Sequence, residues 1–309
     1  MLVGVTGAKG FLGSHVCDAL RVAGHDVAAV RLARPGKQQI IPGALRALVH
    51  CAAKCGGIGF NQHWGYDLFG DNIWLGRQAI DVCRHSHYGN AKLVAVSSVC
   101  AYPNQTEAPF REGAIWSGYP EETNAAYGLA KRLLLEQCRW AQERYGLCYT
   151  AVIPANLYGP RDHTEPDRSH VIPAIIRAIA EAKSNGTDVT LWGSGAPTRD
   201  FLYVPDCAAA IVRAVEIDDP RPINLGTGVE TSIHLLALTI ADLMGYHGEI
   251  KWDASKPNGQ LRRCVDSSRA RKVLGWQATT SLQDGLRKTI EWQRRSRMQT
   301  KRRLIGARS

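Results

Sequence analysis

The stretch L-V-G-V-T-G-A-K-G-F-L-G, residues 2–13, decides the fold. It begins with a short apolar run, Leu2–Thr6, that leads directly into a glycine-rich turn. A pattern with helical spacing follows at Phe11–Ala23, and Asp26–Val30 is a second apolar run. Strand, turn, helix and strand make a βαβ unit, and such a unit implies a parallel sheet.

The turn has glycines in the spacing G-x-x-G-x-x-G, at Gly7, Gly10 and Gly13. Glycine lets the backbone turn tightly and approach a pyrophosphate, whose charge is stabilised at the N-terminus of the following helix. The three glycines and the first helical residues, Phe11 and Leu12, are therefore predicted to bind a dinucleotide cofactor. A turn with only a structural role is the alternative.

The residues after the second strand favour one dinucleotide over the other. An acidic side chain at this point would bind the ribose of NAD. Here Val30 is followed by Arg31 and Arg34, with no acid between them, and arginine suits a 2′-phosphate. NADP, used as NADPH, is the expected cofactor, and a solvated basic loop is the alternative.

Strands and helices continue to alternate along the chain. The patterns predict elements at Leu45–Ala52, Ile73–His85, Lys92–Ser98, Ala126–Tyr145 and Cys148–Pro154. This alternation is typical of an α/β fold with a doubly wound parallel sheet. We expect a Rossmann domain over residues 1–157, to which about 200–228 return, a smaller C-terminal substrate lobe mainly over 158–300, and a basic tail over 294–309.

Composition and charge exclude several classes of protein. The chain has 309 residues, 45% of them hydrophobic, and a net charge of +10. Residues 287–309 carry nine Lys or Arg and one acid, which is +8, so the rest of the chain carries only +2. A nearly neutral body argues against nucleic-acid binding. No apolar run reaches the ~18 residues of a membrane helix, so no membrane partner is expected.

Cysteine usage and the N-terminus bear on location. Nine scattered cysteines without a C-x-x-C pair indicate thiols in a reducing compartment. No basic segment precedes an apolar one at the N-terminus, so we expect no signal peptide and a cytoplasmic protein. His85 and His87 are two residues apart on a predicted helix and do not share a face, so no metal site is expected.

Three polar residues suggest chemistry. Tyr127 and Lys131 form the pattern Y-x-x-x-K at the start of a predicted helix. Their i,i+4 spacing puts them on one face, where the ammonium is expected to lower the pKa of the tyrosine and make it a proton donor or acceptor. Ser98 ends a predicted strand, where the active sites of parallel sheets lie, and its hydroxyl suits a substrate carbonyl.

The glycine turn, Ser98, Tyr127 and Lys131 occur in an order that resembles the extended short-chain dehydrogenase/reductase family, most of whose members act on nucleotide-activated sugars. Further residues fit the same pattern, and the resemblance places them at the cofactor: Ala52, Ala53, Lys54 and Asn72.

Longer strings resemble the GDP-L-fucose synthase family more closely. They are Ala52-Ala-Lys-Cys-Gly-Gly-Ile58, Ser98-Val-Cys-Ala-Tyr-Pro103, Asn156-Leu-Tyr-Gly-Pro160, Ser169-His-Val-Ile-Pro-Ala174, Trp192-Gly-Ser-Gly195 and Asp253-Ala-Ser-Lys-Pro-Asn-Gly259. The resemblance implies 3,5-epimerisation of a GDP-4-keto-6-deoxy sugar and reduction at C4 by NADPH. It also implies a homodimer built on the predicted helices 73–85 and 126–145.

The resemblance assigns catalytic roles. Cys100 is the implied base and His170 the implied acid that invert C3 and C5. Ser98 and Tyr127 would hold the sugar O4, and Lys131 would bind the nicotinamide ribose. Because Cys100 follows Ser98 by two residues, an extended strand end would point both side chains the same way.

The resemblance also implies the remaining contacts. For the cofactor they are Pro154, Asn156, Leu157 and His170; for the substrate they are Asn156, Val171, Trp192, Arg199 and Arg263. Trp192 would flank the guanine and Arg199 the diphosphate or ribose, while Arg263 stands where the family has lysine. Surface arginines that form ion pairs are the alternative.

Three departures from the family leave the exact sugar open. Residues 31–44 are too few for the helix, strand and loops that the family has there, so one strand and its helix are expected to be missing. Ala178 stands where the family has arginine, and Ser97 where it has glycine. The alternatives are a redox-neutral NAD(P)-dependent epimerase or a simple 4-ketoreductase on a different nucleotide sugar. A non-catalytic binding protein is supported only by the basic tail.

Overall fold

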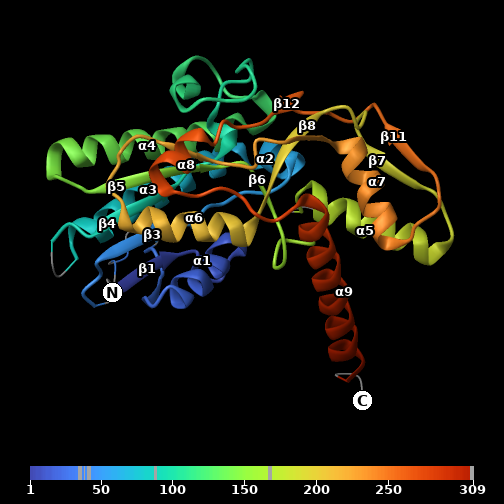
Figure 1. Ribbon diagram of the computed structural model, residues 1–309, viewed down its shortest axis with the longest axis horizontal. Helices are drawn as coiled ribbons and strands as arrows, with labels where there is room; N and C mark the ends of the chain where they lie inside the picture. Colours follow the sequence, from blue (N-terminus) through green and yellow to red (C-terminus); the bar gives the residue numbers. More distant parts are fainter. Residues whose placement is uncertain (34–36, 38, 40–42, 87–88, 166–168, 307–309) are drawn as a thin grey trace.

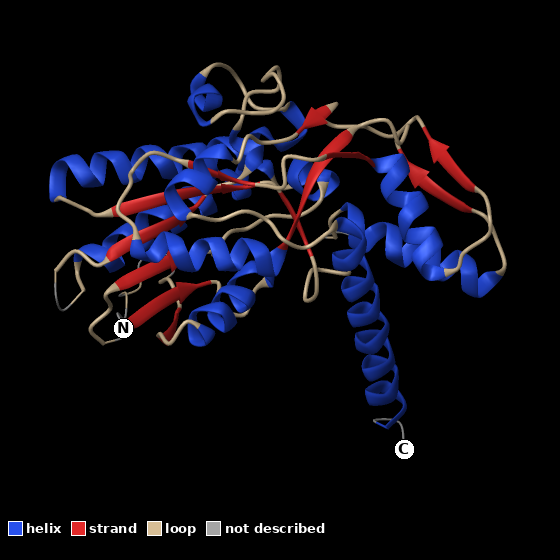
Figure 2. Cartoon of the chain, in the orientation of Figure 1, coloured by secondary structure: helices blue, strands red, loops and turns tan. Residues whose placement is uncertain are grey.

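The computed structural model describes residues 1–33, 37, 39, 43–86, 89–165 and 169–306, with side chains up to Met298. Two layered parts lie side by side, and a long C-terminal helix extends away from them (Figures 1 and 2). The larger part has a parallel sheet between helices. The smaller part consists of short strands and two helices, and the chain crosses between the parts several times.

The larger part is built on a six-stranded sheet in the order β2-β1-β3-β4-β5-β9, with every neighbouring pair parallel. The strands are β1 (Leu2–Thr6), β2 (Asp26–Val30), β3 (Ala47–His50), β4 (Lys92–Val96), β5 (Tyr149–Pro154) and β9 (Ile223–Leu225). The chain first builds outward from β1 to β2 and then returns to the other side of β1. Ligands bind at such a reversal, at the carboxyl ends of the strands. The expected doubly wound parallel sheet is confirmed.

Helices cover both faces of this sheet (Figure 1). On one face α1 (Phe11–Val22) packs against α6 (Val204–Glu216), and on the other α3 (Gly65–Arg84) packs against α4 (Ala125–Tyr145). Strands β3, β4 and β5 are buried at nearly every position, as expected where both faces of a parallel sheet are covered. One apolar core therefore fixes every strand end that faces the candidate site.

The smaller part has its own apolar core. In one sheet β8 (Thr198–Tyr203) lies between β10 (Glu230–Ser232) and β12 (Arg262–Arg263), and β6 (Asn156–Tyr158) also pairs with β8; β7 (Val189–Trp192) pairs with β11 (Ile250–Asp253). The helices α5 (Val171–Asn185) and α7 (Ile233–Met244) pack on each other. Because β8 leads directly into α6, the two parts are joined through continuous elements.

Some boundaries differ from those expected. The helix expected at Ile73–His85 begins eight residues earlier as α3, at Gly65, and follows the short helix α2 (Ile58–His63). Among the described residues between β2 and β3, which are 31–33, 37, 39 and 43–46, there is no helix or strand. The sheet order accordingly passes from β2 through β1 directly to β3.

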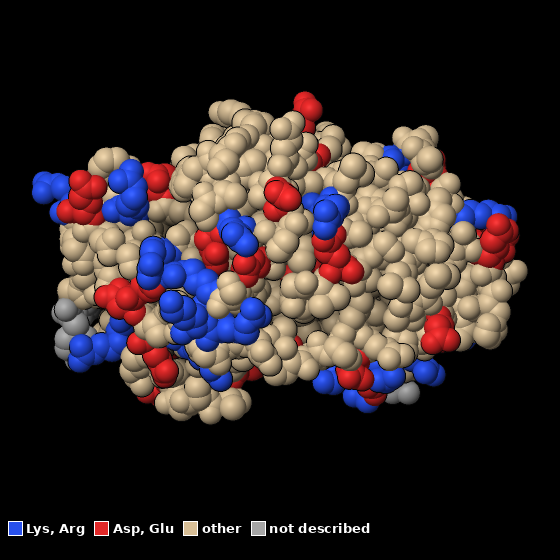
Figure 3. All heavy atoms as spheres, turned by 45° about the horizontal axis from the view of Figure 1, so that its top comes forward, with Lys and Arg blue, Asp and Glu red and all other residues tan. Residues whose placement is uncertain are grey.

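The chain ends in a long helix that extends away from both parts (Figure 1). Helix α9 (Leu282–Gly306) includes residues 294–306 of the expected basic tail, and residues 307–309 lie outside the described residues. On the face in Figure 3, Lys and Arg lie beside Asp and Glu over much of the surface. All nine cysteines lie in the described part of the chain, and none is in a disulfide. No helix among the described residues has the length and apolar character needed to cross a membrane.

Candidate active site

The glycine turn links β1 to α1 at the carboxyl edge of the sheet. Gly7 has φ of +66°, a conformation that favours glycine. A Cβ on Gly13 would lie 2.1 Å from the Gly7 carbonyl oxygen, so only glycine lets the helix begin this close to the turn. Phe11 opens α1, and Leu12 packs against the main core. The turn therefore leaves the amino end of α1 facing the edge where a pyrophosphate would bind.

The loop after β3 is held against this turn. The amide of Ala52 donates to the Thr6 hydroxyl (3.1 Å). The buried Asn72 side chain accepts from the Lys54 amide (2.9 Å) and donates to the Lys54 carbonyl (2.9 Å). Ala53 lies between these two anchors. The polar residue Asn72, predicted on pattern alone, thus fixes the shape of the loop from α3.

Of the two arginines expected to select NADP, the structure describes one. Arg31 directly follows β2 and is exposed, which leaves its guanidinium accessible at the sheet edge. Arg34 lies outside the described residues.

Ser98 and Cys100 share one tight turn. The expectation of an extended strand end here is wrong: β4 ends at Val96, and Val99–Ala101 form a 3₁₀ helix, η1. Ser98 caps it, because its Oγ accepts the Cys100 amide hydrogen bond at 3.2 Å. The two residues remain neighbours, but the cause is a capping hydrogen bond rather than strand alternation.

Helix α4 approaches this turn closely. A Cβ on Gly128 would lie 2.2 Å from the Cys100 carbonyl oxygen, so the glycine after Tyr127 sets the distance between α4 and η1. The Ser97 hydroxyl also donates to the Lys131 carbonyl at 3.0 Å. Backbone contacts therefore hold the Tyr127 turn of α4 beside Ser98 and Cys100.

The expectation that Lys131 lowers the pKa of Tyr127 is wrong in this structure. Burial raises the pKa of Tyr127 well above its usual range, the sulfurs of Cys55 and Cys100 raise it further, and a hydrogen bond with Ser98 opposes them. The Lys131 Nζ lies 5.9 Å from the tyrosine ring and donates to the Val96 carbonyl at 2.9 Å. A phenol in this state is a proton donor.

Burial also acts on the lysine and on the strand beneath it. It lowers the pKa of Lys131 to about 8, against the opposing effect of Cys55 and Cys51. His50, at the end of β3, bonds to the Thr6 hydroxyl at 2.9 Å. Burial, with the charge of Lys131 adding to it, lowers the pKa of His50 to about 3. The floor of the site is thus polar and enclosed, with the neutral His50 ring below the ammonium of Lys131.

Two arginines from the smaller part reach Cys100. The Arg263 Nη1 lies 3.4 Å from the Cys100 sulfur, and its Nε donates to Gln260 at 3.0 Å. Arg199 is its register partner across β8 and β12. Burial lowers the pKa of Arg199 to about 9, repulsion from Arg263 adds to this, and Cys100 and Glu121 oppose it. The Arg263 guanidinium therefore contacts the Cys100 thiol, and Arg199 lies in register beside Arg263.

His170 ends the loop that precedes α5. Its Nδ1 lies 3.1 Å from Oδ1 and 3.3 Å from Oδ2 of Asp162. Burial alone would lower the pKa of His170, but the hydrogen bond and charge of Asp162 outweigh it and raise the pKa above its ordinary value. The ring is therefore protonated over a wider pH range than that of a free histidine.

The other predicted contacts lie around these groups. Pro154 ends β5; Asn156 and Leu157 lie in β6, where Asn156 donates to the Asp200 carbonyl at 3.0 Å. Val171 begins α5. Trp192 ends β7 with 65% of its surface exposed, and the Lys256 Nζ lies 5.6 Å from its ring. An exposed ring beside a cation suits a flat ligand with phosphate groups.

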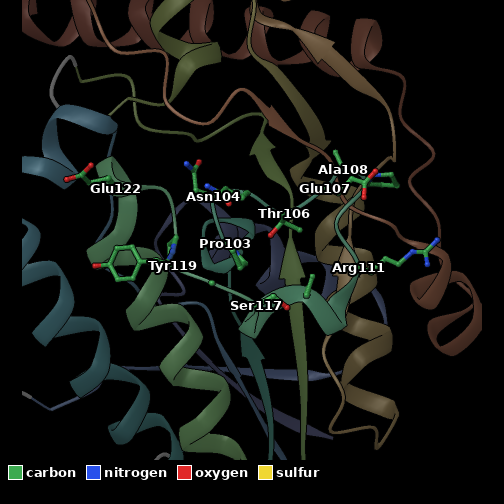
Figure 4. Close-up of a pocket in the computed structure, with 14 residues that line it drawn as sticks. Pro103, Asn104, Thr106, Glu107, Ala108, Arg111, Ser117, Tyr119 and Glu122 are labelled. Carbon is green, nitrogen blue, oxygen red and sulfur yellow. The ribbon is translucent and has the colours of Figure 1, made fainter.

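An open pocket of about 970 Å³ lies beside the site, in the excursion 103–122 (Figure 4). Its lining includes Asn104, Glu107, Arg111 and Tyr119, and none of the predicted site residues in the described part of the chain. The candidate site is therefore assigned from the cluster of reactive groups at the strand ends, not from this hollow.

Sequence reasoning missed Asp162 and Glu121. Both are buried carboxylates in loops, and hydrogen bonds from Thr123 and Asn124 with the charge of Arg263 lower the pKa of Glu121 although its burial opposes them. The signal available for Asp162 was an acid in the string Gly159-Pro-Arg-Asp162, ahead of the histidine already chosen.

Comparison with known proteins agrees with this geometry. A family described as the NAD dependent epimerase/dehydratase family matches residues 3–226. The chain belongs to this family, and it is an enzyme of the short-chain dehydrogenase/reductase type.

Individual relatives have a narrower name. GDP-L-fucose synthase of Escherichia coli (strain K12) is 39% identical over 252 residues, covering 78% of both chains. GDP-L-fucose synthase of Sinorhizobium fredii is 36% identical over 296 residues, covering 93% of both. The crystal structure of a GDP-L-fucose synthetase from Naegleria fowleri bound to NADP is 27% identical with a TM-score of 0.81, covering 94% of this chain and 92% of that one. The resemblance stated from the sequence strings is confirmed.

Proposed function

We propose that this enzyme epimerises a GDP-4-keto-6-deoxy-hexose at C3 and C5 and then reduces its C4 ketone with NADPH. The observation that carries the proposal is the contact between Cys100 and Arg263, because a simple reductase needs no thiol beside the carbonyl site. The relatives named above are GDP-L-fucose synthases, which supports the GDP sugar as substrate.

The glycine turn fits a dinucleotide, because it places the amino end of α1 at the carboxyl edge of the sheet, and a Cβ on Gly13 would lie 2.1 Å from the Gly7 carbonyl oxygen and disrupt that turn. The turn would hold the pyrophosphate, Arg31 the 2′-phosphate, and Lys131 the nicotinamide ribose. The NADP-bound relative supports this cofactor. When bound, NADPH supplies the hydride for C4.

The chemistry of the chain's own residues follows from their charges. In a 4-keto sugar the protons on C3 and C5 are acidic because loss of either gives an enolate. Cys100, which contacts Arg263, acts as the base that takes a proton from one face, and His170 returns one to the other. Ser98 and Tyr127 donate hydrogen bonds to O4, where the enolate charge develops. In the reduction Tyr127 gives its proton to O4, and its raised pKa keeps the phenol protonated before that step.

The remaining residue roles are also proposed from the resemblance to GDP-L-fucose synthases. Trp192 flanks the guanine, Arg199 is beside the diphosphate or ribose, and Asn156 and Val171 contact the sugar; Pro154, Leu157, Asn72 and the Ala52–Lys54 loop enclose the cofactor. The domains are those stated from the sequence, and the enzyme acts in the cytoplasm. A homodimer forms through α3 and α4, whose outer side exposes Trp74 and Trp140.

The test follows hydride and carbon-bound protons together. The enzyme is given GDP-4-keto-6-deoxy-mannose and NADPH in deuterium oxide, with NADH in a parallel reaction. We expect one NADPH consumed per product, deuterium at C3 and C5, and slower turnover with NADH. In Cys100→Ser, deuterium incorporation falls about 100-fold or more, because an alcohol is a far weaker acid than a thiol, while slow reduction of the ketone persists.

Three outcomes would contradict the proposal. Turnover without net NADPH consumption would point to a redox-neutral epimerase. Reduction without deuterium at C3 or C5 would point to a simple 4-ketoreductase. Normal double inversion by Cys100→Ser would remove the thiol from the chemistry.

A further inference from the structure

The proposed function assigns no role to the buried carboxylate of Asp162. Its side chain is 2% exposed, whereas the His170 ring that it contacts is 38% exposed. The preceding residue, Arg161, has φ of +69°, a conformation uncommon for a residue other than glycine and seen at functional sites. This backbone turn places a charged group inside the protein directly behind a partly exposed imidazole.

The contacts of this carboxylate fix the ring. Oδ1 accepts the His163 amide hydrogen bond at 2.8 Å and lies 3.1 Å from the His170 Nδ1, while Oδ2 lies 3.3 Å from the same nitrogen. A carboxylate accepts, so Nδ1 carries a proton. The second nitrogen, Nε2, is then the one that gains or loses a proton in the reaction.

We propose that Asp162 is a positioning residue that holds His170 as a cation, with Nδ1–H bonded to the carboxylate and Nε2–H available to the sugar, and so makes His170 the acid and Cys100 the base. This inference rests on the proposed function. The raised pKa of His170, caused by Asp162 against the effect of burial, agrees with it.

The charges around the two proton-transfer residues are opposite in sign. Arg263 contacts the Cys100 sulfur, Arg199 acts on the same sulfur, and the Glu121 carboxylate faces both arginines. Among the residues that the structure describes, the charged group that acts on His170 is Asp162. A cation therefore lies beside the proposed base, Cys100, and an anion lies beside the proposed acid, His170.

The proton balance is closed without another reagent. The Cys100 thiolate takes the carbon-bound proton, and the electron pair of that bond becomes the enolate on O4. The His170 Nε2–H then gives its proton to the opposite face of the same carbon, and the enolate pair forms the new carbon–hydrogen bond. Cys100 is left as a thiol and His170 as a neutral ring that keeps Nδ1–H on Asp162. Exchange with water restores both.

The decisive variant is Asp162→Asn, because an amide oxygen still accepts from Nδ1–H while the charge is gone. Asp162→Glu keeps the charge. Asp206→Asn is the matched control, since that carboxylate caps the backbone at Thr279 and Thr280 instead. The His170 ring is titrated by NMR in the full-length protein, with its signal assigned from His170→Asn, and product formation and deuterium exchange are measured across pH.

We expect the pKa of His170 to fall in Asp162→Asn, because the charge that raises it is gone. An acid is lost as pH rises through its pKa, so the upper limb of the kcat/KM profile moves to lower pH. Inverted product should fall about tenfold at pH 8 and much less at pH 6, while exchange by Cys100 persists. Asp162→Glu should restore most of the profile.

An unchanged titration of His170 in Asp162→Asn would overturn the inference. So would a loss of activity that is equal at all pH values, or one that Asp206→Asn reproduces, because both indicate a merely structural role. If His170→Asn itself forms the inverted product normally, the proposed function of the histidine fails instead, and the titration still reports on Asp162.

Discussion

Ser98, Tyr127 and Lys131 are held by elements of the six-stranded sheet, whereas Arg263, Asp162 and His170 come from a two-residue strand and a loop of the smaller part. The first group shares one continuous core and is tied by backbone contacts such as that between Gly128 and Cys100. The second group depends on side-chain contacts: the one between Arg263 and Cys100 crosses the two parts, whereas those to Gln260 and between His170 and Asp162 lie within the smaller part.

The difference separates two kinds of chemistry. Reduction of a carbonyl needs a fixed proton donor beside the cofactor, and a rigid sheet edge supplies it. Inversion at two carbons needs an acid and a base on opposite faces of the sugar, so it needs residues from both parts. Changes at Arg263, Asp162 or His170 should therefore affect inversion more than reduction.

The largest effect is expected for the rigid half of the site, which is the group Ser98, Tyr127 and Lys131 held by the six-stranded sheet. Tyr127→Phe removes the proton donor from a buried position, and NADPH oxidation with the 4-keto substrate should fall about 10²–10⁴-fold, the usual contribution of a general acid. Thermal unfolding should remain close to that of the wild type. A variant with near-normal turnover would remove Tyr127 from the mechanism.

A smaller effect is expected where the two parts meet. Arg263→Gln removes the cation at Cys100, and deuterium exchange at C3 and C5 should fall about 10–100-fold, since a thiolate loses its close counter-charge. Arg263→Lys retains the charge and should keep most of the exchange. Equal losses of exchange and of reduction in Arg263→Gln would show that the two halves are not separable.

The smallest effect concerns stability of the sheet rather than activity. His50 is neutral in the fold, with its pKa lowered to about 3, so between about pH 6.5 and 3 the unfolded chain binds more protons at this residue. The contribution of His50 to the free energy of unfolding is therefore complete above about pH 6.5 and is lost as the pH falls. Between pH 7 and 5, the free energy of unfolding of His50→Gln should therefore fall by on the order of 1–2 kcal/mol less than that of the wild type. Urea unfolding measures this difference.

Much of the rigid half was predictable, because its signals are local. The glycine turn specifies β1 and α1, and the i,i+4 spacing puts Tyr127 and Lys131 on one face of α4. The environment of those residues was not predictable from spacing: burial, a property of the whole fold, outweighs the lysine in setting the pKa of Tyr127.

The other half was predictable only as a set of candidates. Cys100 and His170 were chosen from short strings, but their partners lie 163 and 8 residues away in sequence. The geometry between Ser98 and Cys100 was also wrong, because a capping hydrogen bond turns the chain into η1 where strand alternation was assumed. Asp162 gave no periodic signal, since loop residues follow none.

The close approach at Gly128 limits how this enzyme can diverge. Any side chain at that position would have its first carbon 2.2 Å from the Cys100 carbonyl oxygen, so a substitution must separate the helix of the reducing tyrosine from the turn of the thiol. A lineage that gives up inversion and keeps reduction can replace the thiol in one step, but it cannot use position 128 to reshape the pocket. New substrates are therefore accessible mainly through the smaller part, where single side chains rather than backbone atoms set the spacing.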